Sequence, residues 1–298
     1  MNNYLIIGAS GLIGSRVAKL LKGNILTPSE KEVDITDISS VKKYFEINKD
    51  KFNAVINFAA FTDVDRAEEQ KGDKNGFVWK LNVEGTKNLV QLSKEFGKFQ
   101  IQISTDFVFP GTEGNPGPYL EDAKTPDSYD EINWYGWTKL QAEKEVMKEN
   151  PKSCVIRIAY PFYAAKYELK TDFAKKILEL YEAGTLYPLF EDQVISPLYV
   201  NDFPKAIEKI VDLGKQDIYH VVTSDTCTYW EFGNYLLEKA KGARNAPKKG
   251  SMKKFLETPG KAQRPRLGGL KTEKTQKKLG IKFKSWKQAV DEFLSGLN

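Results

Sequence analysis

Tyr135 and Lys139 are the two residues whose types and spacing most directly suggest chemistry. They stand four residues apart at the head of the run Leu140–Met147, so a helix over this region places both on one face. A free tyrosine hydroxyl titrates near ~10. A neighbouring ammonium lowers the tyrosine pKa toward the range of a useful general acid or base. Because any solvated helix can carry such a pair by chance, its meaning depends on the other motifs.

A glycine-rich turn near the start of the chain predicts dinucleotide binding. The turn, Gly8-x-x-Gly11-x-x-Gly14, follows the apolar run Tyr4–Ile7 and leads into a helix pattern that includes Leu12. Gly8 permits a sharp turn, Gly11 lets a pyrophosphate approach the backbone, and Gly14 lets the helix pack close to the sheet. The helix N-terminus then offers unpaired N–H groups to the phosphates.

A third motif, Ser104-Thr105-Asp106, follows the strand pattern Phe99–Ile103. In an open parallel sheet, ligands bind at the carboxyl ends of the strands. We therefore expect the Thr105 hydroxyl and the Asp106 carboxylate where a substrate carbonyl has to sit. The run Ala54–Ala60 predicts another buried strand, with Ala59 to Thr62 at the end where a cofactor would cross.

Composition excludes several classes of protein. With 298 residues, 41% hydrophobic and 29% charged, the chain can bury an ample core and is ordinary for a soluble globular protein. No apolar run is long enough to cross a bilayer, and no secretory leader is visible, so we expect a cytoplasmic protein. His220 is the only histidine, and Cys154 and Cys227 are isolated. We therefore expect neither a Ser-His-Asp hydrolase, a histidine metal site nor a disulfide framework.

Charge is unevenly spread along the chain. The net charge is +5, and lysine and arginine crowd the segment Lys239–Lys287. Without a nucleic-acid motif or interleaved aromatic residues, this segment predicts a solvated surface or a basic pocket for a phosphorylated small molecule. The acids of Asp63–Glu69 lack a fixed ligand spacing, so a solvated helix start is favoured over a metal site. We predict no metal and no nucleic-acid partner.

The pattern of segments predicts an α/β fold, a Rossmann-type doubly wound parallel sheet with a smaller C-terminal substrate-binding domain. We expect residues 1–160, with a returning segment at about 193–225, to form the dinucleotide-binding domain. Residues 161–192 and 226–298 would form the substrate-binding portion. The remaining elements expected are strands at Asn24–Thr27, Val155–Ile158 and Ile218–Val222, helices at Val41–Asn48, Trp79–Phe96, Phe173–Glu182 and Tyr229–Ala240, and a basic loop at Lys241–Leu270.

The preference between NADH and NADPH is not decided by these motifs. An NAD-preferring site usually carries an acid near the end of the second strand. Near Thr27 the candidates are mixed, and the acid about twenty residues beyond the last glycine is Asp34. The pair Asp34-Ile35 more often flanks the adenine.

Together these motifs resemble the extended short-chain dehydrogenase/reductase superfamily, and within it the dTDP-4-dehydrorhamnose reductase family. The similarity covers nearly the whole chain. The segments that carry it are Asn57–Glu68, Ser104–Phe109, Asp192-Gln193, Arg264-Pro265 and Trp286–Val290. This family reduces the C4 ketone of a nucleotide-linked 6-deoxyhexose. The resemblance therefore implies an NADH- or NADPH-dependent oxidoreductase of dTDP-rhamnose biosynthesis with a nucleotide-sugar substrate, and it leaves a homodimer open.

The resemblance also implies roles for individual residues. Tyr135 would protonate the developing alkoxide, Lys139 would hold the nicotinamide ribose and lower the tyrosine pKa, and Thr105 would bind the ketone oxygen. Asp106 would bind a sugar hydroxyl. Independently of the resemblance, the basic stretch Lys241–Leu270 suggests that some of its cations, Arg264 first, face the nucleotide-sugar diphosphate, with general surface charge as the alternative. Besides Tyr135 and Lys139, the implied cofactor contacts are Gly8, Gly11, Leu12, Ile13, Gly14, Asp34, Ile35, Ala59, Ala60, Phe61, Thr62 and Ile103.

Two departures from the family pattern concern the substrate. The family usually has Thr-Ser-Trp after the arginine of the next strand, whereas here Arg157 is followed by Ile158-Ala159-Tyr160. Tyr160 is expected to stack on the sugar in a pocket of different shape. The segment Asp127–Trp134 is also longer than expected. Two alternatives stay open: a nucleotide-sugar epimerase or dehydratase, and a non-catalytic dinucleotide-binding regulatory subunit resembling that of methionine adenosyltransferase.

Overall fold

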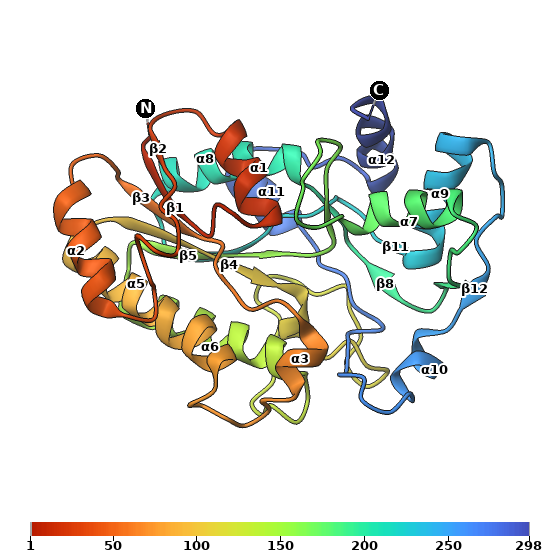
Figure 1. Cartoon of the computed structure of the whole chain (residues 1–298), viewed down its shortest axis with the longest axis horizontal. Coiled ribbons are helices and arrows are strands. Elements are labelled where there is room, and N and C mark those ends of the chain that lie inside the picture. Colours follow the sequence, from red (N-terminus) through yellow and green to blue (C-terminus); the bar gives the residue numbers. More distant parts are fainter. Residues whose placement is uncertain (1, 298) are drawn as a thin grey trace.

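Six parallel strands form the main sheet of the protein, which the computed structural model describes from residue 2 to residue 297 (Figure 1). The strands are β1 (Tyr4–Ile7), β2 (Ile25–Leu26), β3 (Ala54–Asn57), β4 (Phe99–Thr105), β5 (Ser153–Ile158) and β10 (Asp217–His220). Their order across the sheet is β10-β5-β4-β3-β1-β2. The chain winds outward in opposite directions from β1 and β3, and ligands bind at the carboxyl ends of strands at such a reversal.

Helices cover both faces of this sheet (Figure 1). One face carries α1 (Leu12–Leu20), α8 (Phe203–Leu213) and α11 (Glu273–Leu279), and the other carries α2 (Ile38–Asn48), α5 (Gly85–Glu95) and α6 (Trp134–Glu149). Because both faces are covered, every residue of β1, β3, β4 and β5 is buried, including polar residues such as Gln100 and Gln102 of β4. The predicted α/β class and the doubly wound parallel sheet are confirmed.

The connection between β3 and α5 differs from the prediction. The sequence predicts one helix from Trp79 to Phe96, but the structure has a π-helical turn inside it. The elements here are α3 (Val64–Glu68), α4 (Phe77–Trp79) and the π turn η1 (Lys80–Glu84). Inserted π turns occur frequently at functional sites. The 3₁₀ turns η2 (Asp106–Val108) and η3 (Val200–Asp202) follow β4 and β9.

A smaller lobe lies beside the sheet (Figure 1). Its elements are β6 (Pro161–Phe162), α7 (Phe173–Glu182), β7 (Leu189–Phe190), β8 (Val194–Ile195), β9 (Leu198–Tyr199), β11 (Cys227–Thr228), α9 (Tyr229–Lys241), β12 (Lys249–Gly250), α10 (Met252–Leu256) and α12 (Trp286–Ser295). The expected loop Lys241–Leu270 therefore contains β12 and α10. Asp192 stabilises the start of α10, since its carboxylate accepts hydrogen bonds from the Ser251 hydroxyl at 2.9 Å and the Met252 amide at 2.6 Å.

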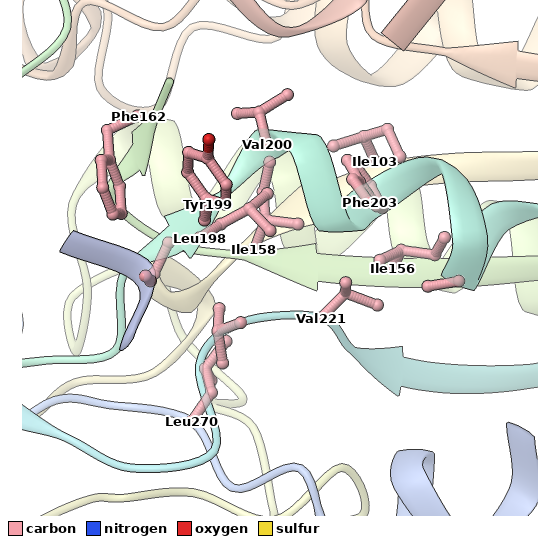
Figure 2. Packing of buried hydrophobic residues seen from close by; sticks show 14 of the residues in the cluster. Ile103, Ile156, Ile158, Phe162, Leu198, Tyr199, Val200, Phe203, Val221 and Leu270 are labelled. Atoms are coloured by element: carbon pink, nitrogen blue, oxygen red, sulfur yellow. The ribbon is translucent and has the colours of Figure 1, made fainter. Parts of the chain in front are cut away.

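One hydrophobic core joins the sheet to the lobe. Figure 2 shows a part of it, in which Leu198, Tyr199 and Val200 lie between Phe162 of the lobe and Phe203 of α8. The structure places α8 and β10, which belong to the predicted returning segment, on the main sheet. The division of the chain into two domains stays a prediction. Within residues 2–297, no helix has the length and apolar character that a membrane span requires.

Candidate active site

A cavity of about 630 Å³ lies at the carboxyl ends of β1, β3, β4 and β5. Its lining comes from the glycine-rich turn, the strand ends, α6 and the segment after β5. The residues are Gly8, Gly11, Leu12, Ile13, Gly14, Phe58, Ala60, Thr62, Val64, Ile103, Ser104, Thr105, Asp106, Phe107, Tyr135, Lys139, Ile158, Ala159, Tyr160, Pro161, Tyr167, Leu169 and Lys170. The structure thus brings together the glycine turn, the Ser-Thr-Asp motif and the Tyr-Lys pair.

The glycine-rich turn has a shape that only glycine allows at two positions. Gly8 has φ +77°, and a Cβ there would lie 2.5 Å from the Ala59 amide nitrogen. A Cβ on Gly14 would collide with the Gly8 carbonyl oxygen, so α1 can pack against the turn only with glycine there. Gly11 is exposed at the N-terminus of α1, where the first-turn amides lack intrahelical acceptors. This geometry fits a dinucleotide pyrophosphate.

Several contacts at the start of α6 place Tyr135 in the cavity. Asn133 caps the helix by accepting a hydrogen bond from the Gly136 amide at 2.7 Å. Glu68 of α3 accepts another from the Trp134 amide, also at 2.7 Å. Gly136 lies so close to the Phe107 carbonyl oxygen that a side chain there would collide with it. Glycine beside the tyrosine therefore lets α6 approach the end of β4.

Thr105 and Asp106 lie at that strand end as predicted. The Thr105 hydroxyl donates to an Asp106 carboxylate oxygen at 3.1 Å and accepts from the Phe107 amide at 3.2 Å. Burial raises the pKa of Asp106 to about 7, although the Thr105 hydroxyl and nearby backbone N–H groups act in the opposite direction. Asp106 can therefore offer a donor or an acceptor to a ligand near neutral pH.

The expected lowering of the tyrosine pKa is wrong. Burial raises the pKa of Tyr135, the Thr105 hydroxyl lowers it, and the Asp106 charge raises it further. Burial also lowers the pKa of Lys139 to about 8, which the Glu143 carboxylate opposes. Residue spacing says nothing about desolvation, which is the largest cause of the raised pKa. Tyr135 is consequently a protonated phenol at neutral pH.

Replacement of Asp106 by asparagine is expected to stabilise the protein increasingly as pH rises. Between the ordinary pKa of 3.8 and the folded-state pKa of about 7, the folded protein holds a proton that the unfolded chain has lost. Wild-type stability therefore falls with pH through this window, by about 1.4 kcal/mol per pH unit. The variant does not lose stability in this way. Its free energy of unfolding, relative to that of wild type, should therefore rise by on the order of 3 kcal/mol between pH 5 and pH 8.

Urea unfolding of both proteins at the two pH values measures this difference. Burial lowers the pKa of His220 to about 3, so His220 favours folding above its ordinary pKa of 6.5 and loses that contribution on acidification. Because both proteins contain His220, this effect cancels in the comparison. A stability difference that does not change with pH would show that the Asp106 carboxylate is not desolvated.

Tyr160, the substrate residue suggested by the departure from the family pattern, lies in the cavity wall. Its backbone has φ +43°, which is unusual for a bulky residue and is tolerated mainly at functional sites. The Gln193 amide donates to its hydroxyl at 2.6 Å, and its ring packs edge-on against Phe173. Burial raises the Tyr160 pKa. The tyrosine is therefore held rigidly between the sheet and the lobe.

Four predicted cofactor residues do not line the cavity. Asp34 is exposed, and its carboxylate accepts hydrogen bonds from the Thr36 amide at 2.8 Å and hydroxyl at 2.7 Å. Ile35 is buried against Gly85 of α5. Ala59 lies beside Gly8, and Phe61 packs edge-on against Phe77. Their contacts with a dinucleotide stay predictions.

Arg264 lies outside this cavity, at a second one of about 400 Å³ that Lys253 and Arg266 also line. Its guanidinium forms an ion pair with Asp65 at 2.8 Å. Asp65 also accepts from the Ala262 amide at 3.1 Å, while Asp63 caps α3. The acids after β3 thus act as helix caps and as an anchor for the 261–264 segment. Residues 2–297 contain no cluster of acidic, histidine or cysteine side chains that could hold a metal.

Sequence reasoning missed Asn82 in the π turn. Its side chain accepts from the Phe61 amide at 2.8 Å and donates to the Thr138 hydroxyl at 2.9 Å. Asn82 therefore ties the loop after β3 to α6 directly behind the Tyr135 turn. A buried asparagine in an amphipathic helix was the available signal, but periodicity does not reveal a π turn.

Two tyrosines after β5 were also missed, and Ser104 was predicted in the motif without a role of its own. The Ser104 hydroxyl is buried in the cavity wall and has no hydrogen-bond partner within the described residues, so it is available to a ligand. Tyr163 donates to the Leu12 carbonyl at 3.1 Å, and Tyr167 donates to the Ser10 carbonyl. The segment after β5 therefore packs over the glycine-rich turn. These contacts join residues far apart in sequence, which no local pattern indicates.

The chain is similar to known proteins over its whole length. The family model described as the RmlD substrate binding domain matches residues 1–298. The dTDP-4-dehydrorhamnose reductase of Aggregatibacter actinomycetemcomitans is 29% identical over 304 residues, or 97% of each chain. The spore coat polysaccharide biosynthesis protein SpsK of Bacillus subtilis is 28% identical over 99% of this chain and 97% of its own length.

Solved structures agree with this similarity. The dTDP-4-dehydrorhamnose reductase of Bacillus anthracis, in complex with NADP, has a TM-score of 0.86 at 26% identity over 99% of both chains. The Clostridium acetobutylicum protein of the same name has a TM-score of 0.83 at 28% identity over 98% of both chains. The chain therefore belongs to the dTDP-4-dehydrorhamnose reductase family of the extended short-chain dehydrogenase/reductase superfamily.

Proposed function

We propose that this protein reduces the C4 ketone of a nucleotide-linked 6-deoxyhexose, with NADH or NADPH as the reductant. The observation that carries the proposal is the convergence of Thr105, Asp106, Tyr135 and Lys139 in the cavity that contains the glycine-rich turn. A ketone bound there would lie near the Tyr135 proton donor, the Lys139 cation and the polar side chains of Thr105 and Asp106. The reductases named above share this family, and one of them was solved with NADP.

The chain offers contacts for each part of a dinucleotide. The amides around Gly11 and the N-terminus of α1 would hold the pyrophosphate, while Ala60 and Thr62 would flank the nicotinamide side. Lys139 would bind the nicotinamide ribose. When bound, the reduced nicotinamide supplies the hydride that goes to C4 of the sugar. The protein aligns the reactants and stabilises charge at the ketone oxygen.

The raised pKa of Tyr135 suits the proton transfer of a reduction. As the oxygen at C4 becomes an alkoxide, the Tyr135 hydroxyl donates its proton to that oxygen. The phenolate left behind is stabilised by the Lys139 ammonium. Thr105 donates a hydrogen bond to the same oxygen, and Asp106 binds a neighbouring sugar hydroxyl. A phenol that stays protonated at neutral pH is the acid that this direction of the reaction requires.

The test is the loss of nicotinamide absorbance with dTDP-4-dehydro-6-deoxy-L-mannose, run in parallel with NADH and NADPH. Consumption of the cofactor with a rhamnose-type product supports the proposal and identifies the coenzyme. A changed sugar without net cofactor consumption would favour the epimerase or dehydratase alternative. Cofactor binding without turnover of any 4-keto sugar would overturn the proposal and favour the regulatory alternative.

Replacement of Arg264 by alanine is expected to raise KM for the nucleotide sugar about tenfold and to leave kcat nearly unchanged. A hydrogen bond to a charged group contributes about 1.5–3 kcal/mol, and about 1.4 kcal/mol corresponds to a factor of ten. Arg264, Lys253 and Arg266 line the same cavity, so their cations suit a diphosphate. Steady-state kinetics at fixed cofactor concentration measure the effect.

The matched control is Arg244→Ala. Arg244 is an exposed arginine that pairs with Glu238 at 2.8 Å and lines neither cavity. This variant should keep the wild-type KM. An unchanged KM in Arg264→Ala would mean that Arg264 serves only to anchor the chain to Asp65.

A further inference from the structure

Behind the active-site cavity, α6 carries a third polar residue on its buried face. Tyr135, Lys139 and Glu143 follow one another at intervals of four residues, so they form a row along one side of the helix. Lys139 is 3% exposed and Glu143 is 2% exposed. The row therefore leads from the phenol in the cavity to a carboxylate deep inside the protein.

Arg157 of β5 holds this carboxylate from the opposite side. Its Nε donates to Oε1 of Glu143 at 2.9 Å, and its Nη2 donates to Oε2 at 2.7 Å. Its Nη1 donates to the Glu121 carbonyl at 3.3 Å and lies 3.4 Å from Nε2 of His220. The guanidinium also lies 4.8 Å from the Phe109 ring centroid. The two-pronged contact leaves Glu143 little freedom to move.

Stability alone does not account for this pair. Removing two charges from water costs several kcal/mol per ion, and apolar residues of similar volume often replace such a pair without loss of stability. Arg157 and Glu143 occur where β5 and α6 meet, next to the end of β4, and Arg157 is in register with Ser104. The pair thus joins α6, which delivers Lys139 to the cavity, to β5, the neighbour of the strand that delivers Thr105.

We propose that Glu143, fixed by Arg157, is a positioning residue that keeps Lys139 in its charged form beside the reactive tyrosine. The inference deepens the proposed reductase activity and rests on it. The Glu143 carboxylate lies one helical turn beyond Lys139 and attracts its ammonium, while Arg157 prevents the carboxylate from turning away. When Tyr135 gives up its proton, the phenolate then faces a cation rather than a neutral amine.

The other groups around Lys139 support this assignment. Burial lowers the pKa of Lys139 to about 8, and Glu143 is the charge that opposes this effect. On α6 the other titratable neighbour is Tyr135, and η2 contributes Asp106, both of which line the cavity with Lys139. Asn82 of η1 and Thr86 of α5 are buried polar side chains that carry no charge. His220, against Arg157, is neutral above its pKa of about 3.

The test uses the intact protein, a Glu143→Gln variant, and a double variant with Glu143→Met and Arg157→Met. The double variant removes both charges with apolar side chains of similar length, so it avoids an unpaired buried arginine. Lysines are labelled with ¹³C, and the Lys139 resonance is identified by its absence in Lys139→Met. Its chemical shift is then followed against pH in protein without substrate, alongside the pH profile of kcat.

We expect Lys139 to titrate about one pH unit lower in Glu143→Gln than in wild type, because a removed carboxylate no longer favours the ammonium. The shift should keep this direction but be smaller in the double variant, because that variant also loses the Arg157 cation. The alkaline limb of kcat should move to lower pH by the same amount. A merely structural role would instead leave both titrations unchanged in whichever variant folds. Unchanged titrations, or the unfolding of both variants, would overturn the inference.

The lysine titration separates this inference from the proposed function. It needs neither cofactor nor sugar, so it gives a result even if the protein reduces no keto-sugar. Absence of turnover in wild type together with a shifted lysine titration would refute the reductase activity and keep the Glu143–Lys139 coupling. Turnover with an unshifted titration would refute the coupling alone.

Discussion

Replacement of Tyr135 by phenylalanine is expected to lower turnover by about 10²–10⁴-fold while dinucleotide affinity stays near wild type, since a positioned general acid contributes a factor of this size. The substitution removes only the hydroxyl that would protonate the ketone oxygen. The ring can keep its edge-on contact with Phe107, whose centroid lies 5.8 Å away. The caps of α6, Asn133 and Glu68, bind backbone amides and do not depend on the hydroxyl.

Turnover is measured from cofactor oxidation, and affinity from quenching of intrinsic tryptophan fluorescence. Trp134 and Trp137, which flank the tyrosine in α6, are suitable reporters. The matched control is Tyr129→Phe, because Tyr129 is 40% exposed and does not line the cavity. Full activity in Tyr135→Phe would remove the tyrosine from the mechanism, whatever the control does.

Replacement of Gly8 by alanine is expected to lower the affinity for the dinucleotide by about 100-fold or more, so that binding is no longer measurable. Two effects add at this position. The φ of +77° disfavours any side chain, and the added Cβ would lie 2.5 Å from the Ala59 amide nitrogen. Left-handed backbone costs about 1–2 kcal/mol and overpacking about 1–3 kcal/mol. The turn must move to relieve the clash, which displaces the amides that would hold the pyrophosphate.

Gly72→Ala separates these two effects. Gly72 has a similar φ of +83°, but nothing lies within 4 Å of its Cβ position. This control carries the backbone penalty without the clash, so its cofactor affinity should equal that of wild type even if its melting temperature falls. Fluorescence titration with NADH and NADPH measures both variants. Wild-type affinity in a folded Gly8→Ala protein would contradict the role assigned to the turn.

Much of the fold follows from local patterns in the sequence. The bounds of α7, Phe173–Glu182, agree with the prediction, and β1 occupies the predicted run Tyr4–Ile7. Gly97, the residue after the predicted helix Trp79–Phe96, has φ +66°. Such features depend on periodicity and on backbone conformations that few residues adopt, and both can be recognised without knowing what packs where.

The arrangement of the site follows only in part from such patterns. Motifs at the carboxyl ends of parallel strands must meet at one edge of the sheet, and this rule brings Thr105 and Gly8 to the same cavity. The rule does not say which neighbouring residues face inward. Phe61 follows β3 and Asp34 was expected at the adenine, yet neither lines the cavity. Phe61 packs against Phe77, and the Asp34 carboxylate accepts hydrogen bonds from Thr36.

The doubly wound sheet, the glycine-rich turn and the Tyr-Lys pair on one helix face are predictable from the sequence, because spacing along the chain specifies all three. The protonation of that pair, the Asp65–Arg264 anchor and the Glu143–Arg157 pair behind Lys139 become visible only in the folded protein. pKa values and buried ion pairs depend on desolvation and on partners distant in sequence, and residue spacing carries no information on either.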